Sequence, residues 1–152
     1  MATTGTHRKT AGRDATSSPG YLLKRAQDAL HAAMSVALRE HDATLPQYAV
    51  LTALDEEPGL SNADLARRAF VTPQTMNQVL RELEGKRWAE RHPHPGNARI
   101  LRAELTPDGR AALRACHQAV DAIQERMLSG LDAASRQQLA AALRSCIESL
   151  SR

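Results

Sequence analysis

Amide, hydroxyl and guanidinium side chains gather in one short segment of the chain, TPQTMNQVLR at residues 72–81. They are Thr72, Gln74, Thr75, Asn77, Gln78 and Arg81. Glutamine and asparagine pair with adenine through two hydrogen bonds, threonine contacts the methyl group of thymine, and arginine binds guanine or a phosphate. The set therefore matches the groups that DNA displays in its major groove. An ordinary solvated helix face is the alternative interpretation, because polar helix faces are common.

A second polar group surrounds a turn at residues 93–97, whose sequence Pro-His-Pro-Gly-Asn is a strong turn signal. At its tip and beside it lie Arg91, His92, Asn97, Arg99 and Arg102. An arginine at the tip of a hairpin suits insertion into a narrow minor groove of DNA, where the negative potential is strongest. His92 and His94 make too weak a ligand set for a metal site to be expected.

Helix signals predict how the first group is positioned. Thr72 and Pro73 form a helix start, and the helical pattern continues to Gly85. The apolar stripe of this helix is Met76, Val79, Leu80 and Leu83. When the stripe faces inward, the residues on the opposite face are Gln74, Gln78 and Arg81, flanked by Thr75 and Asn77.

The neighbouring segments complete a winged helix-turn-helix. A capping signal at Ser61 and Asp64 opens a short helix that ends near Arg68. The short segments 88–92 and 100–105, on either side of the turn, predict the two strands of a β-hairpin. Two short helices followed by a basic hairpin describe this kind of DNA-binding unit.

Longer helices flank the unit. Apolar spacing and capping signals predict helices from Tyr21 to about His41, Thr44 to about Glu56, Thr106 to about Leu128, and Asp132 to about Leu150. The last two carry more apolar positions than the DNA-binding unit can cover, so we expect a partner subunit to cover them. Packing of these helices only onto the first helix of the same chain is the alternative. The predicted fold class is mainly α with a small β-hairpin wing.

Length and charge fit a single domain. The chain has 152 residues and a net charge of only +3, but residues 61–105 hold eight Lys and Arg against five Asp and Glu. Positive charge is therefore concentrated where contact with phosphates is expected. The chain has no apolar run of 18 residues and no secretory signal, so we expect a cytoplasmic protein. The expected boundaries are a disordered tail at 1–18 and one domain at 19–152.

Three segments resemble the MarR (multiple-antibiotic-resistance regulator) family, and the resemblance covers about Tyr21 to Leu150. They are TLPQYAVLTAL, SNADLARRAFVTPQTMNQVLRELE and RHPHPGNARILRAELTPDGR. The last is similar to the family's wing pattern of Arg, Pro, an Asp-x-Arg tip and a closing Leu-Thr-x-x-Gly.

The resemblance implies a triangular homodimer that binds double-stranded DNA at a pseudo-palindromic operator. The winged helix-turn-helix would lie at about 44–106, with dimerisation helices at about 19–42 and 107–151. The recognition helices would enter successive major grooves and the wings the minor grooves. The resemblance also implies a small aromatic or phenolic ligand between the dimer and DNA lobes.

Three residues depart from the family pattern. Asn97 stands where the family usually has Asp, so the salt bridge that orients the wing residue Arg99 is expected to be lost. Arg87 stands where Gly usually ends the recognition helix, and we expect Gly85 to take that role. Phe70 holds a turn position that is often small, and we expect it to pack under the turn.

The leading interpretation is a sequence-specific DNA-binding transcription regulator, a homodimeric repressor released by a small aromatic ligand and needing no cofactor. The candidate DNA contacts are Thr72, Gln74, Thr75, Asn77, Gln78, Arg81, Arg91, Asn97 and Arg99. The candidate contacts for an aromatic acid, in a cleft between the first two helices, are Tyr21, Arg25, His31, His41 and Tyr48. Ordinary surface or core positions are the alternative for each of the five.

Two other classes of function compete with a DNA-binding regulator. An enzyme is not expected, because the chain has no Gly-rich phosphate loop and no nucleophile motif, and Cys116 and His117 would point about 100° apart on a helix. A winged helix that binds protein instead of DNA would need an apolar or acidic recognition face. Cys116 and Cys146 are expected to be buried or half-buried apolar side chains, with a redox switch as the minor alternative.

Overall fold

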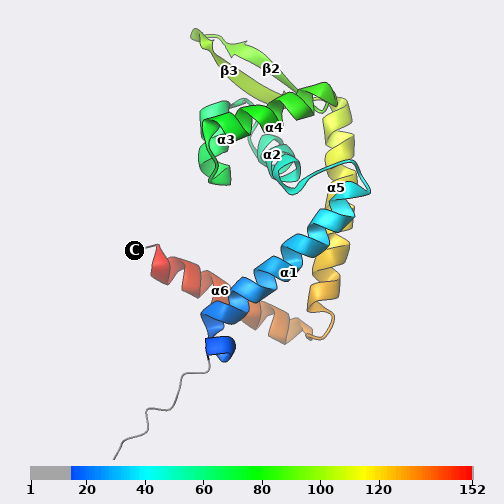
Figure 1. The fold of residues 1–152 in the computed structure, drawn as a ribbon, viewed down its shortest axis with the longest axis vertical. Coiled ribbons are helices and arrows are strands. Elements are labelled where there is room, and N and C mark those ends of the chain that lie inside the picture. Colours follow the sequence, from blue (N-terminus) through cyan, green and yellow to red (C-terminus); the bar gives the residue numbers. More distant parts are fainter. Residues whose placement is uncertain (1–14, 152) are drawn as a thin grey trace, which may run out of the picture.

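Six α-helices and a small antiparallel sheet make up residues 15–151, the part of the chain that a computed structural model describes. The elements are η1 (Ala15–Ser17), α1 (Pro19–Arg39), α2 (Leu45–Glu56), β1 (Leu60–Ser61), α3 (Asn62–Ala69), α4 (Pro73–Gly85), β2 (Ala89–His94), β3 (Asn97–Leu105), α5 (Pro107–Leu128) and α6 (Ala133–Leu150). A winged lobe of α2, α3, α4 and the sheet lies at one end, and α1 and α5 lead from it to α6 at the other end (Figure 1). The arrangement confirms the predicted fold class.

Each α-helix in this part of the chain begins directly after a side chain that accepts a hydrogen bond from the backbone. The capping residues are Ser18, Thr44, Ser61, Thr72, Thr106 and Asp132. All except Ser18 were predicted from the sequence. At Thr44 and Ser61 the third helical residue also bonds back to the cap, which completes a capping box. Each cap contributes about 1 kcal/mol to helix stability.

Each of α1, α3 and α4 is followed within three residues by a left-handed residue that is not glycine. The φ angles of Asp42, Phe70 and Arg87 are 56°, 54° and 60°. In each case the N–H of the following residue donates to the carbonyl five residues earlier, as Trp88 does to Leu83 at 2.9 Å. The prediction that Gly85 takes this role in α4 is wrong, because Gly85 is the last helical residue and the left-handed turn falls at Arg87.

Two side chains lie elsewhere than predicted. Phe70 is 97% exposed, so it does not pack under the helix-turn-helix turn. Cys146 is also exposed on α6, and only Cys116 is buried. Burial raises the pKa of the Cys116 thiol, which disfavours the thiolate that a redox switch would need.

The sheet has one strand more than the predicted hairpin. Its strand order is β1-β3-β2, so β3 is the central strand. The predicted hairpin pairs Ala89 with Leu105 and Arg91 with Ala103. The unpredicted β1 pairs Leu60 with Ala103 and is too short for a sequence pattern of period two to reveal. It attaches the start of α3 to the wing.

Two buried clusters form the core. The larger lies in the winged lobe and joins α2, α3, the apolar stripe of α4, the base of the wing and Leu113 of α5. The smaller joins α1 to α5 through Leu38, Ala43, Cys116 and Val120. Tyr48 and Trp88 pack against both clusters, so they connect the winged lobe to the long helices.

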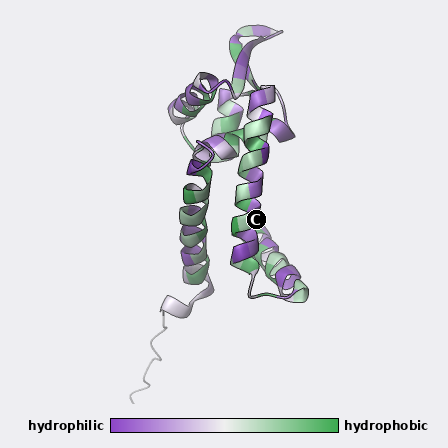
Figure 2. Ribbon diagram, turned by 90° about the vertical axis from the view of Figure 1, so that its right-hand side faces the viewer, coloured by the Kyte–Doolittle hydropathy of each residue, from purple (hydrophilic) through white to green (hydrophobic). Residues whose placement is uncertain are grey.

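The long helices leave an apolar surface uncovered. No residue of α6 is buried. Large apolar side chains that remain exposed on α1, α5 and α6 are Leu22, Leu23, Val36, Met127, Leu139, Leu143, Ile147 and Leu150. An apolar groove of about 510 Å³ runs between these helices and is lined by Leu22, Leu30, Met127 and Leu143 among others. Figure 2 shows hydrophobic stretches along the long helices beyond the winged lobe.

The predicted disordered tail differs from the structure at its last four residues. Residues 1–14 lie outside the described part of the chain, whereas Ala15–Ser17 form η1 and Ser18 caps α1. None of the helices within residues 15–151 combines the length and the apolar character needed to cross a bilayer.

Candidate nucleic-acid interface

The structure gathers most of the predicted base-reading side chains on one face of α4. Met76, Val79, Leu80 and Leu83 are buried in the core of the winged lobe. The opposite face is exposed and carries Gln74, Thr75, Gln78 and Arg81. The hydroxyl of Thr72 caps the helix by accepting from the Thr75 N–H at 3.2 Å. The helix therefore presents its first turns, with two amides, to solvent.

A carboxylate in the last turn of α4 connects this face to the buried side chain of Gln47 on α2. One oxygen of Glu82, Oε1, accepts from Gln78 Nε2 at 3.0 Å. The other, Oε2, accepts from Gln47 Nε2 at 2.8 Å. These two hydrogen bonds, from Gln78 first and Gln47 second, lower the pKa of Glu82 below its usual range. Glu82 is therefore held as a carboxylate between a buried amide and an exposed one.

Gln47 is itself fixed from three sides. Its side chain is only 3% exposed. Its Oε1 accepts from the backbone N–H of Thr44, which completes the capping box of α2, and from Lys86 Nζ at 3.1 Å. The same ammonium group also contacts the backbone carbonyl of Asp42 and lies 4.7 Å from the centre of the Trp88 ring. The end of α4 is thus tied to the turn between α1 and α2.

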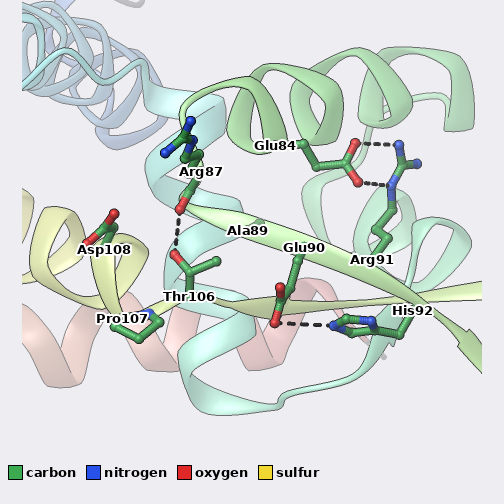
Figure 3. Close-up of a pocket in the computed structure, with 9 residues that line it drawn as sticks. All are labelled: Glu84, Arg87, Ala89, Glu90, Arg91, His92, Thr106, Pro107 and Asp108. Carbon is green, nitrogen blue, oxygen red and sulfur yellow. Dashed lines mark hydrogen bonds and ion pairs between the residues drawn. The ribbon is translucent and has the colours of Figure 1, made fainter.

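Arg91 connects the wing to α4. Its guanidinium forms two hydrogen bonds to Glu84, at 2.8 and 2.7 Å, as Figure 3 shows, and a third to Asn77 Oδ1 at 2.9 Å. These bonds lower the pKa of Glu84 and raise that of Arg91. The Arg91 side chain is only 15% exposed. Three of its five N–H donors are thus used within the chain, and a contact of Arg91 with DNA stays a prediction.

The side-chain amide of Asn77 uses its oxygen to bind Arg91. A guanidinium group only donates hydrogen bonds, so the carbonyl oxygen of Asn77 must face Arg91. Its NH₂ group is the half that remains for another acceptor.

The wing tip is exposed and locally ordered by Asn97. The side-chain oxygen of Asn97 accepts from the backbone N–H of Arg99 at 3.1 Å, so the amide fixes the turn instead of pairing with the guanidinium. His94 Nδ1 accepts from the Gly96 N–H at 2.9 Å on the other side of the turn. Asn97 and Arg99 both lie on the solvent side of the hairpin.

A polar groove of about 730 Å³ runs along the base of the wing (Figure 3). Its charged lining groups include Glu84, Arg87, Glu90 and Asp108. His92 lies 3.2 Å from Glu90 in an exposed pair. Within residues 15–151 no group of three or more His, Cys, Asp or Glu side chains is arranged to hold a metal ion.

The five residues predicted to hold a ligand do not form one cleft within the chain. Tyr21 lies in the first turn of α1, and His41 lies just beyond its last residue, Arg39, which is roughly 27 Å from Tyr21 at 1.5 Å per residue. Arg25 lies over the ring of Tyr21, 6.0 Å from its centre, and His31 is exposed. Tyr48 lies on α2, with its hydroxyl 2.8 Å from His117 Nδ1. The five positions are therefore spread along the whole of α1 and onto α2, and their role as ligand contacts stays a prediction.

Tyr48 instead lines a separate cavity of about 440 Å³ between α1, α2 and α3. Most of its lining is apolar, including Met34, Leu45 and Leu65. Its polar edge carries Thr52 and Arg68, and Arg68 is ion-paired with Glu57. Burial raises the pKa of Tyr48, so its hydroxyl stays protonated.

Comparison with known proteins identifies the family of the chain. A sequence model described as MarR family matches residues 41–100, which include the whole helix-turn-helix and most of the wing. The HTH-type transcriptional repressor Rv2887 of Mycobacterium tuberculosis is 43% identical over 114 residues, covering 75% of this chain and 82% of that protein. The chain belongs to the MarR family.

Solved structures of a MarR-family protein have the same fold. The M. tuberculosis protein Rv2887 in complex with DNA superposes with a TM-score of 0.75 at 37% identity, over 86% of this chain and 98% of that one. The same protein in complex with salicylic acid gives a TM-score of 0.71 at 38% identity, over 86% and 96% of the two chains. These MarR-family structures extend the similarity to α1, α5 and α6, which lie largely outside the segment matched by the family model.

Sequence reasoning missed the residues that support the exposed face in this MarR-family chain. No functional role was predicted for Gln47, Glu82, Glu84 or Lys86. A spacing of four residues between Gln78 and Glu82 was the one available signal, because such side chains are neighbours on a helix. The long-range bonds from Gln47 have no sequence signature.

Proposed function

We propose that this MarR-family protein binds a pseudo-palindromic operator in double-stranded DNA as a homodimer, represses transcription, and is released by a small aromatic acid. The observation that carries the proposal is the exposed amide and arginine face of α4, next to a wing whose tip presents Arg99. We assign the protein no catalytic activity and no cofactor, and we expect it to act in the cytoplasm.

The candidate DNA contacts keep their roles with one exception. Thr72, Gln74, Thr75, Gln78 and Arg81 would approach the major groove through the first turns of α4. Asn97 and Arg99 would meet the minor groove and its phosphates. Asn77 would contribute only its NH₂ group. Arg91 would act indirectly, by holding α4 against the wing.

The apolar surface of the long helices supports the homodimer. Residues 44–106 would form the DNA-binding part, and residues 19–42 and 107–151 the dimerisation part. A partner subunit would cover the exposed stripe of α6, which no part of the described chain covers. Two recognition helices would then meet half-sites one helical turn of DNA apart, roughly 34 Å.

The cavity between α1, α2 and α3 is the site we propose for the ligand. Its apolar walls suit an aromatic ring, and Arg68 with the hydroxyls of Thr52 and Tyr48 suits a carboxylate or phenol. The cavity lies between the α1 helix of the dimerisation part and the α3 helix that precedes α4. A ligand that separated these elements would change the spacing of the recognition helices.

Selection of binding sites from random duplex DNA, followed by fluorescence anisotropy, tests the proposal. We expect an inverted repeat with half-sites about ten base pairs apart, and weaker binding when salicylate is added. Arg68→Ala should reduce the salicylate effect relative to its own starting affinity, whereas Arg67→Ala, which pairs with Asp64 outside the cavity, should keep it. Recovery of no enriched sequence would refute operator binding, and an unchanged affinity with salicylate would refute this ligand class.

A winged helix that binds another protein is the second candidate, and one observation favours it. Phe70 is 97% exposed beside the start of α4, with Val71 37% exposed next to it. A protein partner could cover this pair of exposed apolar side chains. Failure of DNA selection together with binding of a protein that Phe70→Ala abolishes would support this second function.

A further inference from the structure

The exposed amide of Gln78 is held by a chain of hydrogen bonds that begins in the core. We propose that Glu82 acts as a positioning residue for base recognition, fixing the Gln78 amide so that its carbonyl oxygen faces DNA. This inference rests on the proposed DNA-binding function. It adds a residue that makes no base contact itself and predicts which bases Gln78 selects.

The chemistry of the partners fixes the orientation of the Gln78 amide. An ionised carboxylate only accepts hydrogen bonds, so Glu82 Oε1 must face the NH₂ group of Gln78, 3.0 Å away. The carbonyl oxygen of Gln78 is then directed away from Glu82. A free glutamine side chain would instead exchange its two ends easily.

The carboxylate cannot turn away from Gln78 without breaking a second bond. Glu82 Oε2 is bound by the NH₂ group of Gln47 at 2.8 Å. The oxygen of Gln47 is occupied by Lys86 and by the Thr44 N–H, both of which only donate. Gln47 is 3% exposed, and reversing its amide would turn its NH₂ group toward these two donors, so both bonds would be lost. The hydrogen bonds that link Lys86, Gln47, Glu82 and Gln78 therefore fix both amides in one orientation.

The consequence for recognition is a preference for bases that donate. In the major groove adenine and cytosine present amino groups, whereas guanine and thymine present only acceptors at their hydrogen-bonding positions. Gln78 held with its carbonyl oxygen outward should therefore favour adenine or cytosine at the base it contacts. A Gln78 side chain free to reverse would accept any of the four bases with a smaller difference.

Two variants of Glu82 separate its contact from its charge. Glu82→Gln removes the charge and replaces an obligate acceptor with an amide that donates or accepts. Glu82→Asp keeps the charge but shortens the side chain, so the contact with Gln78 is lost. Glu90→Gln is the matched control, because it removes another exposed carboxylate of the winged lobe, one that contacts His92 and not Gln78.

The experiment compares base preferences, measured by selection from random duplexes and sequencing, for the wild type and these variants, each first checked for cooperative unfolding. Gln78→Ala identifies the base position that Gln78 contacts. At that position the wild type should favour adenine or cytosine over guanine or thymine by about tenfold. Both Glu82 variants should reduce this ratio at least threefold, and Glu90→Gln should leave it unchanged.

The outcomes distinguish the role of Glu82 from operator binding itself. An unchanged base ratio in both Glu82 variants, in proteins that still select the operator, overturns the role of Glu82 and leaves operator binding intact. A wild-type preference for guanine or thymine at the Gln78 position also overturns it. A wild type that enriches no sequence at all refutes the proposed function, and the inference falls with it. Combining Gln78→Ala with Glu82→Gln should give the same base ratio as Gln78→Ala alone.

Discussion

The first turn of α5 lies against the backbone of Trp88, and only a residue without a side chain fits there. A Cβ atom on Gly109 would lie 1.8 Å from the Trp88 carbonyl oxygen and 2.7 Å from its carbonyl carbon. The same contact region holds Thr106, whose N–H donates to Trp88 O at 3.1 Å and whose hydroxyl caps α5. The closing Leu-Thr-x-x-Gly segment of the sequence thus joins the base of the wing to the helical lobe.

Gly109→Ala should therefore destabilise the protein, although alanine is the better helix former. Moving α5 away from Trp88 would cost about 1–3 kcal/mol, as overpacking typically does. Urea unfolding followed by circular dichroism measures the change. Gly85→Ala is the matched control, since a Cβ there meets nothing within 4 Å and should stabilise α4 by about 0.5–1 kcal/mol. Equal stabilities for Gly109→Ala and wild type would contradict the contact.

The left-handed end of α4 makes the opposite prediction for Arg87. Its φ of 60° is unfavourable for any residue with a Cβ, so Arg87→Gly should raise the free energy of unfolding by about 0.5–1 kcal/mol. Arg87→Ala removes the same guanidinium but keeps the Cβ, so the difference between the two variants isolates the backbone term. Denaturant titration of all three proteins gives the result. A glycine variant no more stable than the alanine variant would show that the turn is unstrained.

The pair of Glu84 and Arg91 should make stability depend on pH. Its hydrogen bonds with Arg91 hold the pKa of Glu84 below the ordinary value of 4.5. A carboxyl group with a lowered pKa in the folded state stabilises the protein above its unfolded pKa, and this stabilisation is lost as the pH falls through the folded pKa. Glu84→Gln should lower the free energy of unfolding by roughly 1–2 kcal/mol at pH 7.

The difference between wild type and Glu84→Gln should shrink as the pH falls below 4.5, because the protonated wild-type side chain then resembles glutamine. Urea unfolding at pH 7 and at pH 3.5 measures both gaps. Glu90→Gln, which removes a carboxylate of an exposed pair, should change stability by less than about 0.5 kcal/mol at either pH. A gap that is constant with pH would mean that the ion pair contributes nothing specific.

The uncovered stripe of α6 predicts how the dimer can be broken. Leu143 lines the apolar groove between the long helices, and burying a charge there without a partner is strongly unfavourable. Leu143→Glu should give a monomer at micromolar concentration and weaken operator binding at least tenfold. Ser145→Glu, on the opposite side of the same helix, should remain dimeric. Sedimentation velocity distinguishes the two, and a dimeric Leu143→Glu protein would place the interface elsewhere.

The sequence was sufficient for the six α-helices, the β-hairpin and the exposed face of α4. Helix starts depend on local hydrogen bonds from backbone N–H groups to Thr, Ser or Asp side chains, and the stripe of Met76 and Leu83 has a clear helical period. Both signals are therefore visible without a structure. The end of α4 was misplaced because a glycine was assumed to be necessary for a left-handed turn, and Arg87 adopts one instead. Phe70 also adopts a left-handed conformation, and its side chain is exposed where packing under the turn was expected.

Contacts between distant segments could not be predicted. The bond from Gln47 to Glu82 spans 35 residues, and the pairing of β1 with β3 involves two residues of no distinctive pattern. Arg91 is another example, since its two bonds to the Glu84 carboxylate join the wing to α4 and have no signature in the sequence. The five candidate ligand residues lie on helices that are neighbours along the chain, but Tyr21 and Tyr48 do not line one cavity.

The most direct test of the central claim, that α4 reads base sequence and the wing reads charge, is a salt titration of affinity for the selected operator and for a random duplex. Gln74→Ala should weaken operator binding by about 1–3 kcal/mol and leave random-duplex binding unchanged. Arg99→Ala should weaken binding to both duplexes and reduce the salt slope by about one, and Asn97→Asp should strengthen binding by orienting Arg99. Equal losses on both duplexes for Gln74→Ala would contradict sequence reading by α4.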